Sequence, residues 1–520
     1  MALDDQSKRT FKVVGTRVGR PDGIDKVTGK AAYGADITAP GMLHGRILRS
    51  PHAHARIKSI DVSEAAKLAG VKAVVTGADL AIPDDEGFAD IAINCLARDK
   101  VFYDGHAVAA VAATSKSIAK QAIRLIKVDY EILPHVTDVD AAMRPDAPAV
   151  QEGRALENVP AGMSQNVTTH CAFGHGDVDA GFAKADKIIE RSFKTAATHQ
   201  GYIEPQACLA TLGSDGRGEV WCCTQGQYMV RANCAAVLGI EESQLRVISS
   251  EIGGGFGGKT STFIEPVALA LSRKSGKPVK MVMTRDEVLR ATGPTISASM
   301  DIKIGMTNDG RITAARGELR YSGGAYPNET IEMGAQAAFA AYDLEAVETV
   351  GWNVMTNRPK EIPYRAPGAP TSIYAVESVV DELCQELGLD PLDVRLLNAA
   401  RKGTLSAYGP TFNEIGLVAT LEAAKAHPHY TAPLGPNQGR GLSCGFWFNF
   451  GGNTCVSLNI NDDGTVGVVE GNPDIGGSRA SISMMAAEEL GVPYEKVRTV
   501  IADTSALGFN DITDGSRVTF

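Results

Sequence analysis

The amino-acid sequence predicts a mixed αβ fold of the α+β type, with a small N-terminal α/β domain and a larger part built from repeated αβ units. Two observations lead to this fold class. Strand-like and helix-like segments alternate along the chain, and one order of elements (strand, loop, helix, strand, loop) occurs twice. The chain also has 520 residues, which is longer than a single hydrophobic core normally extends, so we expect about two to four domains.

The small N-terminal α/β domain is expected over residues 15–145. Its strands are predicted at residues 45–50, 71–75, 107–113 and 128–133, with an amphipathic helix at 115–127. The apolar residues that share one face of this helix are Ile118, Ala122, Leu125 and Ile126. A proline-rich connection over residues 144–160 then marks the first domain boundary.

The first copy of the repeated unit lies in an expected domain over residues 160–405, and the second in an incomplete domain over residues 435–520. The predicted helices and closing strands of the two copies are at 228–238 with 245–249, and at 480–490 with 497–501. In both copies a loop that carries glycine follows the closing strand. Such a duplication suggests a ligand held between the copies, although two ordinary αβ units would show the same element order.

The segment between the two copies has a regular part and an irregular part. A loop at residues 363–371 is stiffened by prolines and so presents Arg365 at a fixed place. A helix is expected over residues 376–387, with Asp390 capping the next helix. Residues 402–439 are expected to be irregular and to contain the second domain boundary.

The most unusual stretch is residues 253–260, in which five of the first six residues are glycine and the sixth is Phe256. A ligand is expected to approach this bare backbone. The stretch matches both the GxxxxGK-Ser/Thr pattern of phosphate loops and the GxGxxG pattern of dinucleotide loops. The second pattern is disfavoured because such a loop normally opens a domain. The phosphate loop, with Lys259 as its lysine, stays an alternative, although it needs glycine only at its ends.

Composition argues against several other classes of protein. The net charge of −10 is spread without long blocks, which disfavours nucleic-acid binding. No apolar stretch is long enough to span a membrane and no secretory signal is evident, so a cytoplasmic location is expected. The nine cysteines form no CxxC pair and the ten histidines no HExxH motif. Neither a disulfide framework nor a zinc site is therefore expected, and an iron–sulfur cluster would lie on another chain.

Several short motifs are each weak signals alone but are specific in combination. They are residues 19–21, 28–33, 50–61 and 128–134 in the N-terminal domain, and residues 203–207, 224–225, 253–259 and 364–368 in the larger part. In this combination the chain resembles the molybdenum-binding subunit of the xanthine dehydrogenase and aldehyde oxidase family, the molybdenum hydroxylases. The resemblance extends from about residue 15 to the last residue.

The resemblance implies a large, elongated domain that binds molybdenum as a molybdopterin in its cytosine dinucleotide form, without protein ligands to the metal. It implies an enzyme that oxidises an activated carbon with oxygen from water and passes electrons to 2Fe-2S clusters and FAD on partner subunits. By motif match, Gln225 would be catalytic, and Thr260 and Pro367 would line the substrate pocket. The residues matched to cofactor binding are Gly254, Gly255, Phe256, Gly257, Arg365, Ala366, Gly476, Gly477, Ser478, Arg479, Thr513, Ser516 and Arg517.

Three departures from the family pattern narrow these expectations. Relatives that act on xanthine carry Glu where this chain has Thr260, and carbon monoxide dehydrogenases carry Cys where it has Ala366, so neither substrate is favoured. In the loop at residues 476–479, glycine replaces the glutamine of many relatives. Ser478 or Arg479 would have to replace the hydrogen bond of that glutamine.

The resemblance also implies a catalytic glutamate that is not found in this chain, since relatives carry it in a further C-terminal segment. The acidic residues Glu488, Glu489 and Glu495 lie on or beside the last predicted helix and are interpreted as its solvated face, so they are poor candidates for the base. We therefore expect a second molybdopterin subunit to supply the glutamate.

The function expected from the sequence is that of the large part of a split molybdenum hydroxylase acting on a small aromatic, heterocyclic or aldehyde-like substrate. Its expected partners are the second molybdopterin subunit, a 2Fe-2S subunit and an FAD subunit, with no nucleic acid and no membrane span. Four alternatives stay open: a truncated inactive piece, a non-catalytic cofactor-holding or assembly subunit, a hydratase or reductive variant of the family, and a phosphate-loop nucleotide hydrolase.

Overall fold

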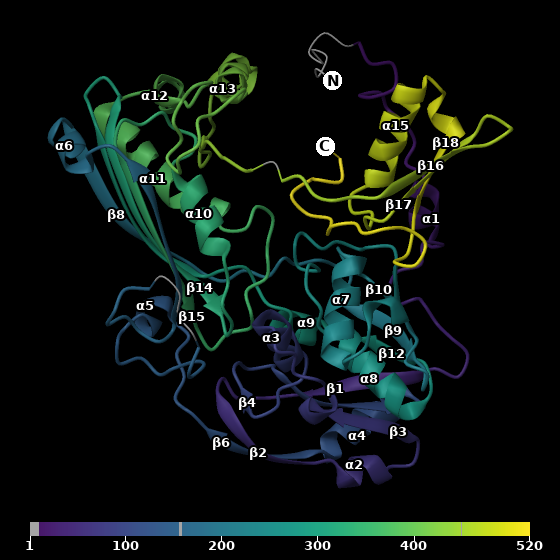
Figure 1. The fold of residues 1–520 in the computed structure, drawn as a ribbon. Helices are drawn as coiled ribbons and strands as arrows, with labels where there is room; N and C mark the ends of the chain where they lie inside the picture. Colours follow the sequence, from purple (N-terminus) through teal and green to yellow (C-terminus); the bar gives the residue numbers. More distant parts are fainter. Residues whose placement is uncertain (1–9, 155–158, 449, 520) are drawn as a thin grey trace. The chain divides into compact units, whose positions relative to one another are not determined.

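The computed structural model describes residues 10–154, 159–448 and 450–519. The chain divides into two compact units (Figure 1). Unit 1 consists of Met1–Leu133, Gln200–Thr292 and Asn449–Phe520, and unit 2 consists of Pro134–His199 and Gly293–Phe448. Each unit therefore combines segments that are far apart in the sequence.

A seven-stranded sheet is the largest element of unit 1. Its strands, in spatial order, are β11 (Leu245–Ser249), β10 (Gly218–Cys222), β9 (Ala207–Leu212), β12 (Val279–Val282), β1 (Leu43–Arg49), β5 (Ala107–Ala113) and β3 (Val71–Thr76). Leu43 of β1 pairs with Val279 of β12 in parallel. This pairing joins the N-terminal strands to the sheet that contains the first-repeat strands β10 and β11. All seven residues of β5 are buried, as expected for a strand covered on both faces.

The other strands of unit 1 form two small sheets. Their spatial orders are β4 (Lys100–Val101), β2 (Ala55–Asp61), β6 (Lys127–Ile132) and β16 (Val456–Ile460), β17 (Val466–Glu470), β18 (Val497–Ile501). The helices of unit 1 are α1 (Gly23–Thr28), α2 (Ser63–Lys67), α3 (Glu86–Cys95), α4 (Lys116–Leu125), α7 (Gln227–Leu238), α8 (Glu265–Ser275), α9 (Arg285–Ala291) and α15 (Ser478–Leu490). The described residues of the unit also form three 3₁₀ turns: η2 (Gly77–Asp79), η3 (Glu242–Gln244) and η4 (Tyr494–Lys496).

The two copies of the repeated unit have the same construction. In the first, β9 pairs antiparallel with β10, and after α7 the strand β11 returns parallel to β10. In the second, β16 pairs antiparallel with β17, and after α15 the strand β18 returns parallel to β17. The helices α7 and α15 end at Gly239 and Gly491, which are both left-handed. The predicted repeat and its closing strands at 245–249 and 497–501 are therefore confirmed.

Unit 2 is built on a five-stranded sheet in the order β7 (Val167–His175), β15 (Val347–Met355), β14 (Ile312–Gly324), β13 (Ala298–Met306) and β8 (Lys187–Thr195). Its helices are α5 (Val139–Ala142), α6 (Val178–Ala183), α10 (Thr330–Ala338), α11 (Ala369–Leu387), α12 (Pro391–Asn398), α13 (Leu417–Ala426) and α14 (Pro428–Thr431). The helices α10 and α11 cover one face of the sheet (Figure 1). In α11 the predicted core residues Val376, Val379, Val380 and Leu383 are fully buried, and each contributes roughly 1.5–3 kcal/mol.

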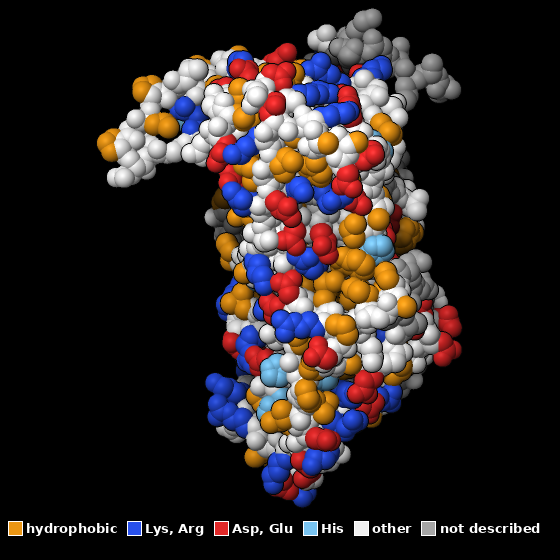
Figure 2. Space-filling view, turned by 90° about the vertical axis from the view of Figure 1, so that its left-hand side faces the viewer, with side chains coloured by type: hydrophobic (Ala, Val, Ile, Leu, Met, Phe, Trp, Pro, Cys, Tyr) orange, Lys and Arg blue, Asp and Glu red, His pale blue; other side chains and the backbone are white. Residues whose placement is uncertain are grey.

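The outward face of the unit 2 sheet carries cross-strand ion pairs. The Nζ of Lys303 on β13 lies 3.7 Å from Oε2 of Glu190 on β8. The Nε of Arg316 on β14 lies 2.6 Å from Oε2 of Glu348 on β15. Figure 2 shows basic and acidic side chains intermingled on the face that it presents. Opposite charges on neighbouring strands support the strand register, although each exposed pair adds little stability.

The structure corrects three local expectations. Residues 402–439 are not irregular throughout, because good helix formers between Gly416 and Pro428 form α13. Leu125, predicted on the buried face of α4, is 39% exposed because it lies in the last turn, whereas Ala119 and Ala122 are buried. Glu488 does not lie on a solvated face. Its carboxylate accepts hydrogen bonds from three consecutive backbone N–H groups, those of residues 12–14.

Candidate functional site

Backbone strain is concentrated at the residues matched to the cofactor. Five non-glycine residues have positive φ in the described part of the chain, and Asn437 is the one outside the predicted set. The other four are Phe256 (φ 55°), Arg365 (φ 32°), Ala366 (φ 62°) and Ser516 (φ 64°). Each such conformation costs on the order of 1–3 kcal/mol, and strained residues of this kind cluster at active and ligand-binding sites.

The side chain of Gln225 ties together the loops of unit 1. Its Oε1 accepts the backbone N–H groups of Gly257 at 2.9 Å and Lys259 at 3.2 Å, and its Nε2 donates to the carbonyl of Thr513 at 2.8 Å. A Cβ on Gly255 would lie 2.4 Å from this Oε1, so the close approach requires glycine there. The amide has a second N–H, which is not used within the described residues, so Gln225 keeps one donor for a ligand.

Lys259 does not have the freedom that a phosphate loop requires. Lys259 is 1% exposed, and its ammonium group lies 2.6 Å from the carboxylate of Glu204, a residue that is 7% exposed. A phosphate-loop lysine must reach the phosphates of a nucleotide. A lysine held in a buried ion pair cannot do so without leaving a carboxylate unpaired, which speaks against the phosphate-loop alternative.

The middle of the glycine run offers hydrogen-bond donors. The backbone N–H groups of Gly254, Gly255 and Phe256 have no partner among the described residues, whereas the amides of Gly253 and Gly257 on either side are both bonded. Phe256 is 47% exposed. Successive unpaired N–H groups on a turning backbone favour an electron-rich ligand such as a pterin oxygen or a phosphate. The residues present therefore fit the cofactor that the motifs imply.

The loop of the second repeat is organised by Asp474. Its carboxylate accepts the backbone N–H groups of Gly477 at 2.9 Å and Ser478 at 2.7 Å, and the Nε of Arg479 at 2.6 Å. Burial raises the pKa of Asp474, but the hydrogen bond and charge of Arg479 outweigh it and hold this pKa below its ordinary value. Arg479 also bonds to Glu251 at 2.7 Å. The side chains of Ser478 and Arg479 thus shape the loop, while the space beside Gly476 is open.

The last described segment lies against both loops. Thr513 donates its N–H to the carbonyl of Gln225 at 2.7 Å and its hydroxyl to the carbonyl of Pro473 at 2.9 Å. Arg517 forms ion pairs with Asp514 and Asp511. Unit 1 therefore brings together the predicted residues of the glycine run, Gln225, the 476–479 loop and the 513–517 segment. Thr260, also in unit 1, donates its hydroxyl to the carbonyl of Gly257 at 2.7 Å.

The predicted residues Arg365, Ala366 and Pro367 belong to unit 2, in the turn that leads into α11. The hydroxyl of Tyr321 donates to the carbonyl of Gly368 at 2.9 Å and so fixes this turn on the sheet. The strained backbone of the turn is therefore supported by the core of unit 2.

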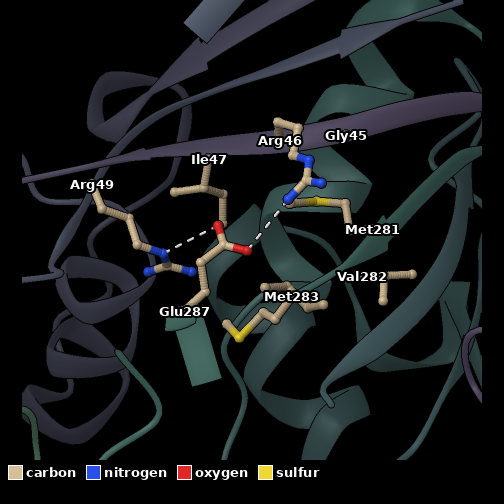
Figure 3. Close-up of a pocket in the computed structure, with 9 residues that line it drawn as sticks. Gly45, Arg46, Ile47, Arg49, Met281, Val282, Met283 and Glu287 are labelled. Carbon is tan, nitrogen blue, oxygen red and sulfur yellow. Dashed lines mark hydrogen bonds and ion pairs between the residues drawn. The ribbon is translucent and has the colours of Figure 1, made fainter. Parts of the chain in front are cut away.

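An open groove of about 640 Å³ runs along α11 from Ala366. Its walls include the aromatic side chains of Tyr374, Phe446 and Trp447. The volume lies within the range of roughly 300–1,000 Å³ that is usual for small-molecule sites. By contrast, a cavity of about 10 Å³ beside Arg49 and Glu287 in unit 1 holds no more than a water molecule (Figure 3).

Two buried glutamates near the predicted loops were missed by the sequence analysis. Glu470, at the end of β17, is 1% exposed, and Glu361 precedes Arg365 by four residues and is 2% exposed. In both carboxyl groups, Oε1 has no hydrogen-bond partner among the described residues, and burial raises the pKa of each to about 7. For Glu470 the sequence held a signal, because it continues the alternation of buried positions through Val466 and Val468.

Glu470→Gln is expected to stabilise the chain at pH 8 by about 1–3 kcal/mol and to change its stability little at pH 5. The pKa of Glu470 in the folded state, about 7, lies above its ordinary value of 4.5. The folded state therefore binds the proton more tightly, and this contribution is complete below pH 4.5 and is lost as the pH rises through 7. Urea unfolding at both pH values measures the effect, with the exposed Glu495→Gln as the control. An equal change in the free energy of unfolding at pH 5 and pH 8 would contradict the prediction that Glu470 binds a proton more tightly in the folded state.

Neither a membrane helix nor a protein-built metal site is found in the part of the chain that the structure describes. No helix there combines the length and the apolar character needed to cross a bilayer. No group of three or more His, Cys, Asp or Glu side chains is arranged there to hold a metal ion.

Comparison with known sequence families gives three matches along the chain. Residues 160–399 match the Molybdopterin cofactor-binding domain, and residues 384–520 match a second domain of the same description. Residues 28–134 match the a/b hammerhead domain of aldehyde oxidase and xanthine dehydrogenase.

Two curated relatives illustrate the similarity. The chain is 31% identical to a probable xanthine dehydrogenase subunit of Bacillus subtilis, over 96% of this chain and 68% of that protein. It is 32% identical to the nicotinate dehydrogenase large molybdopterin subunit of Eubacterium barkeri, over 80% of this chain and 96% of that protein.

Solved structures share the fold. Quinoline 2-oxidoreductase from Pseudomonas putida matches with a TM-score of 0.84 at 26% identity, over 98% of this chain and 69% of that one. Aldehyde oxidoreductase from Desulfovibrio gigas matches with a TM-score of 0.86 at 27% identity, over 97% of this chain and 58% of that one. The predicted mixed αβ class, with a small N-terminal domain and a large repeated part, is thus confirmed.

Proposed function

Since the chain belongs to the xanthine dehydrogenase and aldehyde oxidase family of molybdenum oxidoreductases, we propose that it is the large molybdopterin-binding part of a cytoplasmic hydroxylase. The proposed enzyme oxidises an activated carbon of a small molecule with oxygen derived from water. Its electrons leave through 2Fe-2S and FAD subunits, and a second molybdopterin subunit supplies the catalytic glutamate.

The observation that carries this proposal is the glycine run with its three unpaired N–H groups, held by Gln225 against Thr513. When bound, molybdopterin supplies the two-electron redox chemistry, and the cytosine dinucleotide form is the one proposed. The N–H groups of Gly254, Gly255 and Phe256 and the free N–H of Gln225 would donate to it.

Further cofactor contacts are proposed in unit 1, namely the backbone of Gly257, Gly476 and Gly477 and residues Ser478, Arg479, Thr513, Ser516 and Arg517. Arg365 and Ala366 of unit 2 are proposed as cofactor contacts by motif match alone. Because Arg479 and Arg517 are held in ion pairs, they contribute fixed rather than mobile charge. Fixed donors stabilise developing charge without reorganising during the reaction.

The proposed substrate is a small aromatic N-heterocycle. Thr260 of unit 1 and Pro367 of unit 2 are each proposed as substrate-pocket residues by motif match alone. The names of several relatives support this class, since they specify nicotinate, nicotine and quinoline. Thr260 and Ala366 stand where glutamate and cysteine occur in relatives that act on xanthine and carbon monoxide, so these two substrates are not proposed.

Metal analysis of the complex purified with this chain tests the proposal. About one molybdenum per chain is expected, together with release of a pterin on denaturation. Absence of molybdenum from the complex would contradict the proposed function. Molybdenum with no turnover of any N-heterocycle would instead favour the non-catalytic, cofactor-holding alternative. A co-purifying chain with a catalytic glutamate would support the split enzyme.

A further inference from the structure

The buried carboxylate of Glu204 contacts both ends of the glycine run. Its Oε2 accepts the backbone N–H of Gly253, the first glycine, at 2.8 Å. The same oxygen accepts the ammonium group of Lys259, which follows the last glycine, at 2.6 Å. Its Oε1 accepts the N–H of Gly34 from the N-terminal segment at 3.0 Å. One side chain from the 203–207 motif thus joins three separate segments.

The ion pair between Glu204 and Lys259 is closed to solvent. The two side chains are 6% and 1% exposed, and the ammonium group lies 5.2 Å from the centre of the Tyr202 ring. Removing two charges from water costs several kcal/mol per ion, and their attraction does no more than offset this. Stability alone is therefore a weak reason for the pair, and a role in specifying one conformation is the better-supported reason.

The packing around the pair leaves no freedom at either end of the run. A Cβ on Gly253 would lie 2.6 Å from the Cβ of Glu204, and a Cβ on Gly258 would lie 2.5 Å from the ring of Tyr202. Between these two ends lie the strained Phe256 and the unpaired N–H groups of residues 254–256. The ends are held by buried contacts, while the middle keeps its donors for a ligand.

We infer that Glu204 and Lys259 form a clamp that holds the glycine run in its strained, donor-presenting conformation. They are positioning residues and act on the cofactor through the run; this role rests on the proposed function. The lysine that resembles a phosphate-loop lysine in the sequence thus serves to fix the loop and does not bind phosphate.

Amide hydrogen exchange on the full chain tests the clamp without any cofactor. In Glu204→Gln and in Lys259→Met, exchange at the amides of Gly257 and Lys259 is expected to accelerate by about 100-fold, because a buried charge is left unpaired. These two amides donate to Gln225 and not to Glu204. Their acceleration would therefore report loss of the shape of the run. Faster exchange at Gly253 alone would show a local contact and would overturn the clamp.

Glu377→Gln is the matched control. Glu377 is also a buried glutamate, lies 2.9 Å from the buried Arg395, and accepts one backbone N–H, that of Cys444, at 2.7 Å. Its replacement is expected to accelerate exchange at Cys444 and to leave Gly257 and Lys259 unchanged. Equal acceleration at Gly257 in this control would show general destabilisation and would overturn the assignment.

The double variant Glu204→Gln with Lys259→Met covers the case in which either single variant fails to fold. It removes both buried charges, so it is expected to fold, and its exchange at Gly257 and Lys259 is expected to stay about tenfold or more above that of the parent. Parent-like exchange at these amides in the folded double variant would overturn the clamp.

Molybdenum retention in the assembled complex gives the second readout. The double variant is expected to lose molybdenum during gel filtration at least about tenfold faster than the parent, while Glu377→Gln retains it. Equal retention of molybdenum by the parent, the double variant and Glu377→Gln would overturn the link between the clamp and the cofactor. A parent complex without molybdenum would defeat the proposed function, and hydrogen exchange would still decide whether the clamp exists.

Discussion

Replacing Gln225 by alanine is expected to lower kcat/KM of the assembled enzyme by about 100- to 1,000-fold. The variant removes the acceptor for two backbone N–H groups of the glycine run and the donor to Thr513. It also removes the N–H that is free for a ligand. Steady-state kinetics with an N-heterocyclic substrate measures the effect, and the exposed Gln121→Ala on α4 is the control.

A second substitution at Gln225 separates its two tasks. Gln225→Glu keeps an oxygen that can accept from Gly257 and Lys259, but it loses both N–H donors. Protection of these two amides from exchange is therefore expected to survive while activity is lost. If Gln225→Ala retains kcat/KM within about twofold of the parent, the side chain has no role in the reaction.

Arg395→Met is expected to destabilise unit 2 by about 3–5 kcal/mol. Arg395 is fully buried and lies 2.9 Å from Glu377 and 2.8 Å from Asp381. Without the guanidinium, Glu377 is a buried carboxylate with no cation. Urea unfolding followed by fluorescence reports this unit well, because Trp352 and Trp447 both belong to it.

Arg316→Met provides the comparison in the same unit. The Nε of Arg316 lies 2.6 Å from a carboxylate oxygen of Glu348, but the two side chains are 39% and 46% exposed, so a loss below about 1 kcal/mol is expected. Adding Glu377→Gln to Arg395→Met should recover part of the lost stability, since no buried charge then stays unpaired. If Arg395→Met and Arg316→Met destabilise equally, burial of the Arg395 pair has no energetic weight.

Secondary structure was predictable wherever a local pattern decided it. The strands at 107–113, 245–249 and 497–501 have the predicted bounds, and α11 buries its predicted face. The helix α13 escaped prediction because only Leu421 of its residues is buried, so its apolar pattern is weak. Glu488 was misplaced because its partners, the amides of residues 12–14, lie more than 470 residues away in sequence.

The candidate site was predictable in its residue types and less so in their contacts. A glycine-rich loop with a following lysine is visible in the sequence, and two competing patterns fit it. Burial of Lys259 against Glu204, 55 residues earlier, speaks against the phosphate-loop pattern, and the sequence alone does not show this contact. Glu361 and Glu470 carry no motif, and their raised pKa values arise from burial that a sequence pattern reports weakly.

The sequence by itself determined the mixed αβ class, the repeated unit and the family, because these depend on spacing and motifs that are local along the chain. The tertiary structure alone decided which partners the site residues have. Gln225 bonds to Thr513 across 288 residues, and Lys259 forms a buried ion pair with Glu204. The physical reason is that hydrogen bonding and the burial of charge depend on which distant segments pack together, and a linear pattern does not encode that packing.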